Sequence, residues 1–227
     1  MQFKKVTHVI FDMDGLLIES ESFYDKIIND IVMVYGKEYN DDCKVKVLGT
    51  PEQDTAKIVV EELGLPITPQ EFLTIYKKKQ MTELTNPPLL PGVRELVKHL
   101  YKNEVPVAVA TSSSQESMEL KTKPHQDLFK LFQHIVCGST DPDVKHGKPA
   151  PDIFLVCASR FPDKPDPSSC IVFEDAPNGV KGAQSAGMQS VMVPAPYIPQ
   201  EMKKNATLVL DSLTQFKPEL FGLPPFE

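Results

Sequence analysis

Six short apolar segments, rich in Val and Ile, recur along the chain and are separated by turn residues and helical patterns. They span 6–11, 105–110, 134–138, 170–173, 190–193 and 207–210. Continuous apolar strands that alternate with helices are typical of a parallel sheet buried on both faces. The sequence therefore predicts an α/β fold, with a Rossmann-like parallel sheet and helices on both of its faces.

Helical periodicity occurs between several of these segments. Before the fifth segment, Asn178 is expected to be the N-cap of a short helix and Gly187 the residue after its C-cap. Two other helices are predicted over 91–103 and 151–161. Their apolar faces consist of Val93, Leu96, Val97 and Leu100 in the first, and of Ile153, Phe154, Cys157 and Phe161 in the second.

The long stretch between the first two apolar segments has no convincing strand and three helical patterns. The second pattern covers 51–64, and the third begins with a capping box of Thr68 and Glu71 around Pro69. We therefore predict a helical cap domain over 16–91, inserted into an α/β core domain made of 1–15 and 92–227. The first pattern is the four-residue spacing of Phe23, Ile27, Ile31 and Tyr35.

The charge balance limits the partners. With a net charge of −7 and a pI near 5.3, the chain lacks the clustered Lys and Arg that hold nucleic acid or an anionic membrane. Its four cysteines form no C-x-x-C pair, which argues against a zinc site or a disulfide framework. No stretch reaches the roughly 18 to 20 apolar residues of a spanning helix. We expect a cytoplasmic monomer with reduced thiols and a small-molecule partner, neither nucleic acid nor membrane.

Polar residues come directly after three of the predicted strands. Asp12 and Asp14 follow the first, residues 111–114 (Thr-Ser-Ser-Ser) follow the second, and Glu174 and Asp175 follow the fourth. In α/β sheets, ligands bind in the crevice beyond the carboxyl ends of the strands. A lone Asp-x-Asp is more often a turn or a helix N-cap, but two acidic pairs at separate strand ends are harder to explain in that way.

Carboxylates gathered at one sheet edge need a cation. Two unit charges about 4 Å apart repel by roughly 4 kcal/mol at an effective dielectric constant near 20. The set contains only oxygen ligands, with no His or Cys nearby, and leaves room for water. These features favour Mg²⁺ over Ca²⁺ or Zn²⁺.

Groups that can hold an anion follow the same strands. The hydroxyl-rich residues 111–114 open a helical segment whose first backbone N–H groups are free, although a simple Ser N-cap is common there. Lys148 stands before Pro149 and Pro151, which stiffen its loop; taken alone it would be read as a solvated lysine. Together with the carboxylates, these groups predict a phosphoryl-transfer site.

Four motifs in this order closely resemble those of the haloacid dehalogenase superfamily of phosphatases: FDMDGLL, ATSSS, GKPAPDIF and VFEDAPNGV. The helical insert after the first motif resembles that family's type-1 cap. The resemblance covers essentially the whole chain. It implies a Mg²⁺-dependent phosphatase that forms an aspartyl-phosphate.

The resemblance also implies roles for single residues. Asp12 would be the nucleophile and a metal ligand. Asp14 would be general acid and then general base, and its backbone carbonyl would reach the metal. Thr111, Ser112 and Lys148 would hold the phosphate, with Thr111 and Lys148 counted among the catalytic residues.

The fourth motif would complete the metal site, with Asp175 as a direct ligand and Glu174 as a ligand through water. Asp14 favours phosphate esters, since the dehalogenases of the family lack a carboxyl there. Many members have Asp where this chain has Glu19, at the hinge into the cap. Sugar-phosphate mutases use an Arg where this chain has Glu52, which argues against a mutase.

The expected substrate is a small soluble phosphomonoester of nucleoside or sugar type. The alternatives are a sugar or polyol phosphatase, acting for example on glycerol phosphate or 2-deoxyglucose 6-phosphate, a β-phosphoglucomutase-like phosphomutase, and a non-catalytic phosphate-binding module. Catalysis would also need a lid, and we expect the 16–91 insert to close over the site about linkers near Ser20 and Pro88.

Overall fold

The computed structural model describes residues 3–226 of the chain. One sheet holds six strands in the order β3-β2-β1-β4-β5-β6, and all neighbouring strands are parallel. All six predicted strand segments are confirmed. The strands are β1 (His8–Phe11), β2 (Val107–Thr111), β3 (Ile135–Cys137), β4 (Cys170–Glu174), β5 (Gln189–Met192) and β6 (Leu208–Val209).

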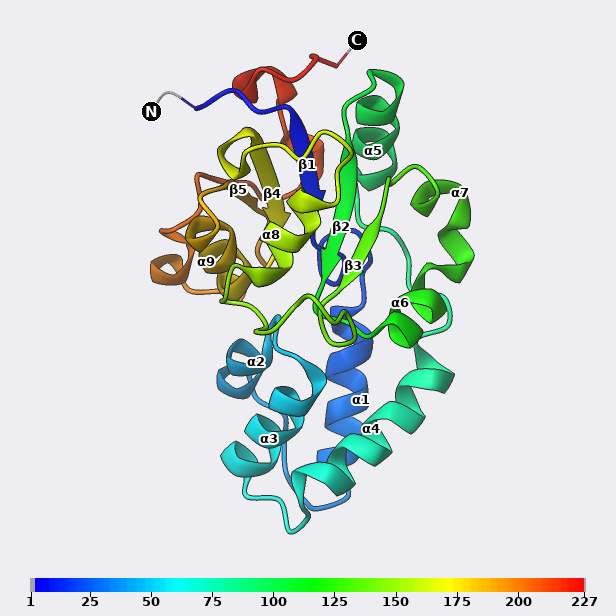
Figure 1. The fold of residues 1–227 in the computed structure, drawn as a ribbon. Helices are drawn as coiled ribbons and strands as arrows, with labels where there is room; N and C mark the ends of the chain where they lie inside the picture. The colour runs from blue at the N-terminus through cyan, green and yellow to red at the C-terminus, as the bar shows by residue number, and fades with distance from the viewer. Residues whose placement is uncertain (1–2, 227) are drawn as a thin grey trace.

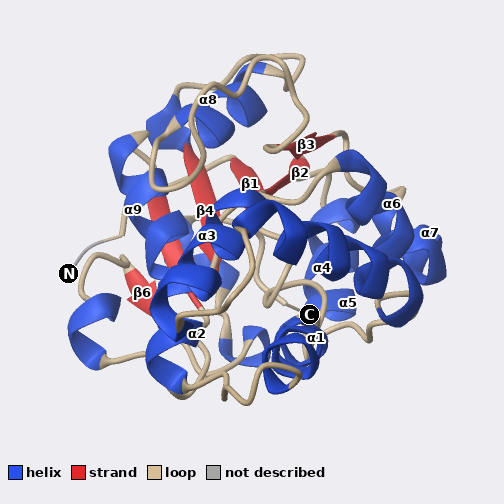
Figure 2. Ribbon diagram, turned by 90° about the horizontal axis from the view of Figure 1, so that it is seen from below, coloured by secondary structure: helices blue, strands red, loops and turns tan. Residues whose placement is uncertain are grey.

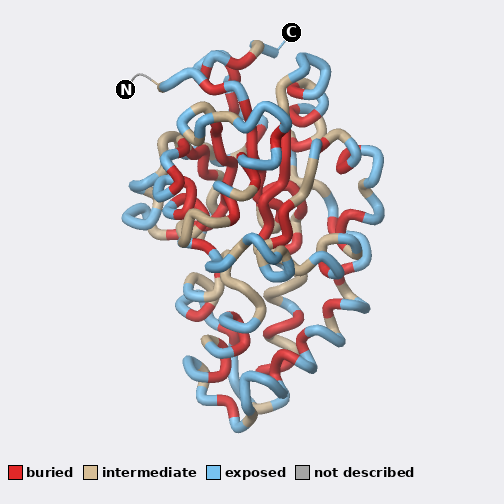
Figure 3. The backbone as a smooth tube through the Cα atoms, in the orientation of Figure 1, coloured by how far each residue is buried: buried red, intermediate tan, exposed pale blue. Residues whose placement is uncertain are grey.

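Both faces of the sheet are covered, because successive strand residues point to opposite sides. Phe11 and Phe173 stack on one face, in the cluster that contains the apolar stripe of α5. Ile10 and Val172 point to the other face, where α8 packs. Figure 3 shows the strands as the most continuously buried part of the chain. The core helices are α5 (Val93–Lys102), α6 (Gln115–Thr122), α7 (Gln126–Phe129), α8 (Asp152–Ser159) and α9 (Pro177–Ser185).

Four helices form a second body at the carboxyl ends of the strands (Figures 1 and 2). They have their own apolar cluster, which includes Ile27, Val59 and Phe72. The predicted capping box is confirmed, since Thr68 and Glu71 cap each other at the start of α4. The helices are α1 (Glu21–Met33), α2 (Asp41–Val47), α3 (Glu52–Leu63) and α4 (Pro69–Glu83).

Sequence reasoning missed α2 and assigned the wrong N-cap residue to α9. Helix α2 has seven residues and buries only Cys43, so it carries no periodic apolar signal. Asn178 is not an N-cap: α9 begins one residue earlier at Pro177, whose fixed φ suits the first helical position. Gly187 follows the C-cap with a φ of +79°, as predicted.

The chain crosses between the two bodies at two adjacent points. The Glu19 N–H donates to the Pro88 carbonyl at 2.8 Å. The Glu19 carboxylate accepts hydrogen bonds from the N–H and hydroxyl of Ser22, so it caps the first turn of α1. Residues 16–18 pack with the core cluster. The domain limits at 16 and 91 stay a prediction.

Short 3-10 helices complete the described structure: η1 (Lys123–His125), η2 (Pro167–Ser169), η3 (Gln200–Lys203), η4 (Leu213–Gln215) and η5 (Pro218–Phe221). All four cysteines are free and buried. Within residues 3–226, no helix combines the length and apolarity that a membrane crossing requires.

Candidate active site

The ends of three adjacent strands build the site. Strand β1 lies between β2 and β4, at the point where the strand order changes direction. Asp12 follows β1, Thr111 ends β2, and Glu174 and Asp175 lie at the end of β4. Parallel strands of one sheet end at the same edge, so residues from distant parts of the sequence become neighbours.

Lys148 joins two of these carboxylates. Its Nζ donates to Asp12 Oδ1 at 2.5 Å, to Glu174 Oε1 at 2.6 Å and to the Ala110 carbonyl at 3.1 Å. The side chain is 2% exposed. Burial lowers the pKa of Lys148, but the charges of Asp12 and Glu174 outweigh it and hold the pKa above its usual range. Lys148 is therefore a fixed cation at the sheet edge, as predicted from its loop.

Asp12, Glu174 and Asp175 form a cluster that can hold a metal ion. Each offers one carboxylate oxygen, and these oxygens lie within 4.8 Å of one another. Burial raises the pKa of Asp12 to about 7, with Lys148 acting against the shift and Glu174 adding to it. Burial, with the charges of Glu174 and Asp12, raises the pKa of Asp175 well above its usual range. Buried carboxylates under this mutual repulsion fit a hard divalent cation such as Mg²⁺.

Two glycines make room for these carboxylates. Gly15 has a φ of +74°, and a Cβ there would lie 2.3 Å from Asp175 Oδ2. A Cβ on Gly179, in the first turn of α9, would lie 1.9 Å from Glu174 Oε1. Both glycines belong to the motifs that carry the acids. Their missing side chains let the carboxylates converge.

Asp14 points to a different set of partners. Its two oxygens accept hydrogen bonds from Lys121 Nζ at 2.6 and 2.8 Å, from Ser20 Oγ at 2.7 Å and from Ser113 Oγ at 2.8 Å. The Tyr24 hydroxyl donates to it at 3.3 Å. Burial raises the pKa of Asp14, but the Lys121 charge and these hydrogen bonds outweigh it, and the pKa is lowered.

Lys121 is the site residue that sequence reasoning missed most clearly. It is fully buried and also donates to Ser113 Oγ at 2.7 Å and to the Tyr24 hydroxyl at 2.8 Å. Ser117 and Lys121 lie four residues apart on α6, and both are buried. That spacing marks a polar helix face, but only packing shows that the face is turned inward.

Residues 111–114 have two structural roles: some contact Asp14 or the cap, and one caps a helix. Thr111 Oγ1 donates to Asp14 Oδ2 at 3.3 Å, and Ser112 Oγ donates to the Gly49 carbonyl of the cap at 3.4 Å. Ser114 is the N-cap of α6, and its side chain accepts from the Ser117 N–H. The simple N-cap interpretation thus holds for Ser114 alone.

The cap covers the site at the carboxyl ends of the strands. Leu48 packs with core residues, among them Ala176 and Val180. The pocket between the two bodies is lined by six of the predicted site residues: Asp12, Asp14, Ser112, Lys148, Glu174 and Asp175. Thr111 contacts this set through Asp14.

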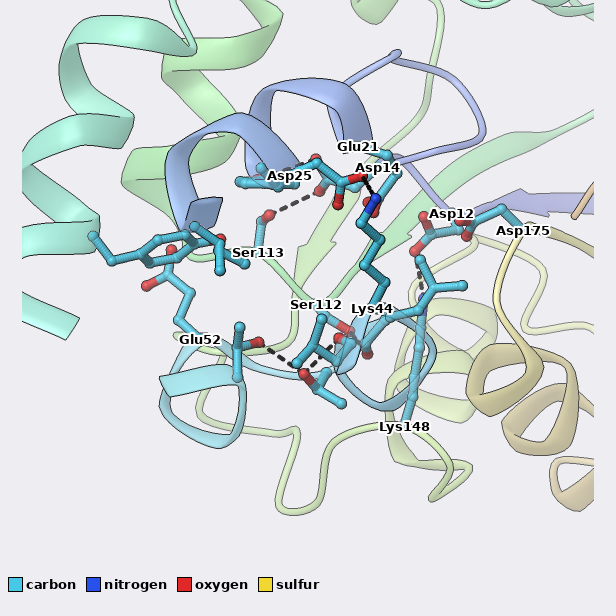
Figure 4. Close-up of a pocket in the computed structure, with 18 of the residues that line it drawn as sticks. Asp12, Asp14, Glu21, Asp25, Lys44, Glu52, Ser112, Ser113, Lys148 and Asp175 are labelled. Carbon is cyan, nitrogen blue, oxygen red and sulfur yellow. Dashed lines mark hydrogen bonds and ion pairs between the residues drawn. The ribbon is translucent and has the colours of Figure 1, made fainter. Parts of the chain in front are cut away.

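The cap contributes a second wall of the pocket. Figure 4 shows Glu52 across the pocket from Asp12 and Asp175. Glu52 therefore lies in the pocket, as the sequence suggested. Burial and the neighbouring carboxylates Asp14 and Asp25 raise the pKa of Glu21 to about 8. Further cap side chains in this wall are Tyr24, Tyr39, Lys44, Thr50, Thr55, Tyr76 and Gln80.

Comparisons with known proteins agree with this geometry. The family model of the haloacid dehalogenase-like hydrolases matches residues 9–193. A Drosophila melanogaster protein named "Probable pseudouridine-5'-phosphatase" is 49% identical, over 98% of this chain and 96% of its own. "(DL)-glycerol-3-phosphatase 2" of Arabidopsis thaliana is 42% identical, over 98% of this chain and 93% of its own.

A solved structure shares the fold. β-Phosphoglucomutase from Clostridium difficile superposes with a TM-score of 0.74, covers 94% of each chain and is 22% identical. At that identity the likeness concerns the arrangement of sheet and cap.

Proposed function

The chain belongs to the haloacid dehalogenase-like hydrolase family, and we propose that it is a Mg²⁺-dependent phosphatase that hydrolyses a small phosphomonoester. The observation that carries the proposal is the cluster of Asp12, Glu174 and Asp175, in which Asp12 and Glu174 also bind the ammonium group of Lys148. The 49% identical relative named for pseudouridine-5'-phosphatase activity supports pseudouridine 5′-phosphate, or a related nucleoside or sugar phosphate, as substrate.

Asp12 is the nucleophile in this proposal. Its carboxylate oxygen forms a bond to phosphorus while the bond between phosphorus and the ester oxygen breaks, which leaves an aspartyl-phosphate. Lys148, Thr111 and Ser112 stabilise the negative charge on the phosphoryl oxygens. A Mg²⁺ ion held by Asp12, Glu174, Asp175 and the Asp14 carbonyl would neutralise the carboxylates and the transferring phosphoryl group.

Asp14 transfers the proton in both steps. It gives a proton to the leaving ester oxygen, and then takes one from the water that attacks phosphorus, which releases inorganic phosphate and restores Asp12. The Lys121 ammonium favours the ionised carboxylate of Asp14. A bound phosphate dianion acts in the opposite direction and favours its protonation. Substrate binding therefore favours the protonated form of Asp14, which then donates this proton to the leaving ester oxygen.

A polyol or sugar phosphatase is the second candidate. The 42% identical relative is named for glycerol 3-phosphate, which is a polyol ester. A phosphomutase has less support, because Glu52 stands in the pocket where a second phosphate would need a cation.

The test is release of inorganic phosphate from a panel of nucleoside, sugar and polyol phosphates, with Mg²⁺ and with excess chelator. We expect wild-type turnover with Mg²⁺, and a loss of at least about 1,000-fold in Asp12→Asn or with chelator. Interconversion of sugar-phosphate isomers without phosphate release would instead identify a mutase. An inactive wild type that binds a phosphate ester tightly would identify a binding module.

The protein acts as a monomer in the cytoplasm, and its four free, buried cysteines support a reducing compartment. The insert over 16–91 acts as a lid that opens to admit substrate. The side-by-side crossings at Glu19 and Pro88 support a hinge there.

A further inference from the structure

The pocket continues past the carboxylate cluster into the cap, where a substrate's leaving group would lie. That wall combines the aromatic rings of Tyr24 and Tyr76, whose centroids are 6.2 Å apart, with several polar side chains. The chemistry of this wall indicates which leaving groups fit.

Charge excludes an anionic leaving group. Two lysines are among the pocket-lining residues that the structure describes, and both are already paired. Lys148 serves Asp12 and Glu174 at the phosphate end. Lys44 lies 3.0 Å from Asp25 and 3.4 Å from Asp41. A second phosphate or a carboxylate on the leaving group would therefore be buried without a partner cation.

Gln80 supplies an unused hydrogen-bond donor. Its side chain is buried, with the residue 5% exposed, and its Nε2 has no hydrogen-bond partner among residues 3–226. Gln80 lies one turn after Tyr76 on α4, and both residues line the pocket wall. A buried amide left unpaired costs about 1–3 kcal/mol. A ligand oxygen at this point would recover that cost.

Glu52 supplies the matching acceptor. It lines the same wall, and its side chain is 14% exposed. One of its oxygens lies 3.5 Å from Lys77 Nζ, a half-exposed lysine on α4 three residues before Gln80. An ionised carboxylate only accepts hydrogen bonds, so its partner on the ligand must be an N–H or O–H donor.

We propose that Gln80 and Glu52 bind the leaving group, with Gln80 Nε2 donating to a ligand carbonyl oxygen and Glu52 accepting from a neighbouring ligand N–H. A neutral pyrimidine base with an imide edge has both groups side by side, and its flat ring suits the Tyr24 and Tyr76 walls. The substrate class is thus a nucleoside 5′-monophosphate of this kind. This inference rests on the proposed phosphatase activity and extends it to specificity.

The test compares kcat/KM for pseudouridine 5′-phosphate with kcat/KM for ribose 5-phosphate, which has the same ester group without the base. Gln80→Met removes the amide at similar length. We expect it to lower the ratio of the two values by about 5- to 50-fold. Gln70→Met, an exposed glutamine on the same helix, should leave the ratio unchanged. The ratio is independent of the folded fraction, so a destabilised variant still gives an answer.

Glu52→Gln keeps the side-chain shape and removes its charge, and it should also lower the ratio. An unchanged ratio in both variants, or a wild type that prefers ribose 5-phosphate or a doubly phosphorylated sugar, would overturn the inference and leave the phosphatase proposal standing.

If the wild type released phosphate from no ester, the phosphatase proposal would fail separately. Binding would then decide the inference, through saturation-transfer NMR with free pseudouridine and with ribose. Pseudouridine signals in the wild type that weaken in Gln80→Met would support it. Equal signals in both proteins would overturn it.

Discussion

Lys121 Nζ lies 2.6 and 2.8 Å from the two carboxylate oxygens of Asp14, and the lysine is fully buried. This ion pair joins helix α6 to the loop after β1. Its position gives Asp14 a defined orientation and charge. Asp12 has Lys148 as its own cation, so each aspartate of the first motif is paired with a different buried lysine.

The first prediction concerns Lys121 as a positioning residue. Lys121→Met removes the cation that holds Asp14, so the pKa of Asp14 should rise and kcat should fall by roughly 10- to 100-fold. The pH–rate profile of kcat measures this, and its acidic limb should move to higher pH. Lys121→Arg should restore part of the activity. A lower kcat with an unmoved profile would contradict the assigned role. Lys123→Met, outside the Asp14 contacts, is the control.

The second prediction concerns pH and stability without metal. The folded-state pKa values of Asp12 and Glu21 are raised to about 7 and about 8 from values near 4, so the native state binds more protons than the unfolded state between those values. These groups therefore make their full contribution to the free energy of unfolding below about pH 4. That contribution decreases as the pH rises toward 8.

Urea unfolding in chelator at pH 5.5 and pH 8.5 measures this effect, and we expect a loss of at least about 1 kcal/mol at the higher pH. Mg²⁺ should restore more stability at pH 8.5 than at pH 5.5, because the ion binds the ionised carboxylates. Equal stabilisation at both pH values would argue against a metal at this cluster.

The third prediction concerns Gly179. Its substitution by Ala would place a Cβ 1.9 Å from Glu174 Oε1, so Glu174 must move. We expect Gly179→Ala to weaken Mg²⁺ binding at least about tenfold, measured by calorimetry, and to lower turnover. Gly64→Ala is the control for general destabilisation: its φ of +58° strains the backbone of an alanine there, but nothing lies within 4 Å of the added Cβ. Unchanged Mg²⁺ affinity in Gly179→Ala would contradict the assigned metal site.

The fourth prediction concerns the contact that closes the cap. Leu48 is 4% exposed and packs on Ala176 and Val180 of the core. Leu48→Ser should weaken this contact by about 2 kcal/mol and favour the open pocket. The expected result is a higher KM with a smaller change in kcat, measured by steady-state kinetics. Val34→Ser, a cap residue that is 78% exposed, should change neither.

The sequence predicted the sheet and the acids at its edge because both obey local rules. Apolar runs form buried strands, and the residues after parallel strands lie at one edge of the sheet, so Asp12, Glu174 and Asp175 could be placed together from their order alone. The capping box at Thr68 is equally local and was found. Helix α2 was missed because a short helix that buries only Cys43 leaves no pattern in the sequence.

The order of amino acids was thus enough to specify the fold class, the acid cluster and the lysine of the third motif. Tertiary packing decided which further polar residues face inward: Lys121 on Asp14, and Gln80 in the cap wall. The reason is that polar side chains are normally solvated, so their types and spacing carry no sign of burial. Only the packing of α4 and α6 against the rest of the molecule removes these groups from water and makes them part of a site.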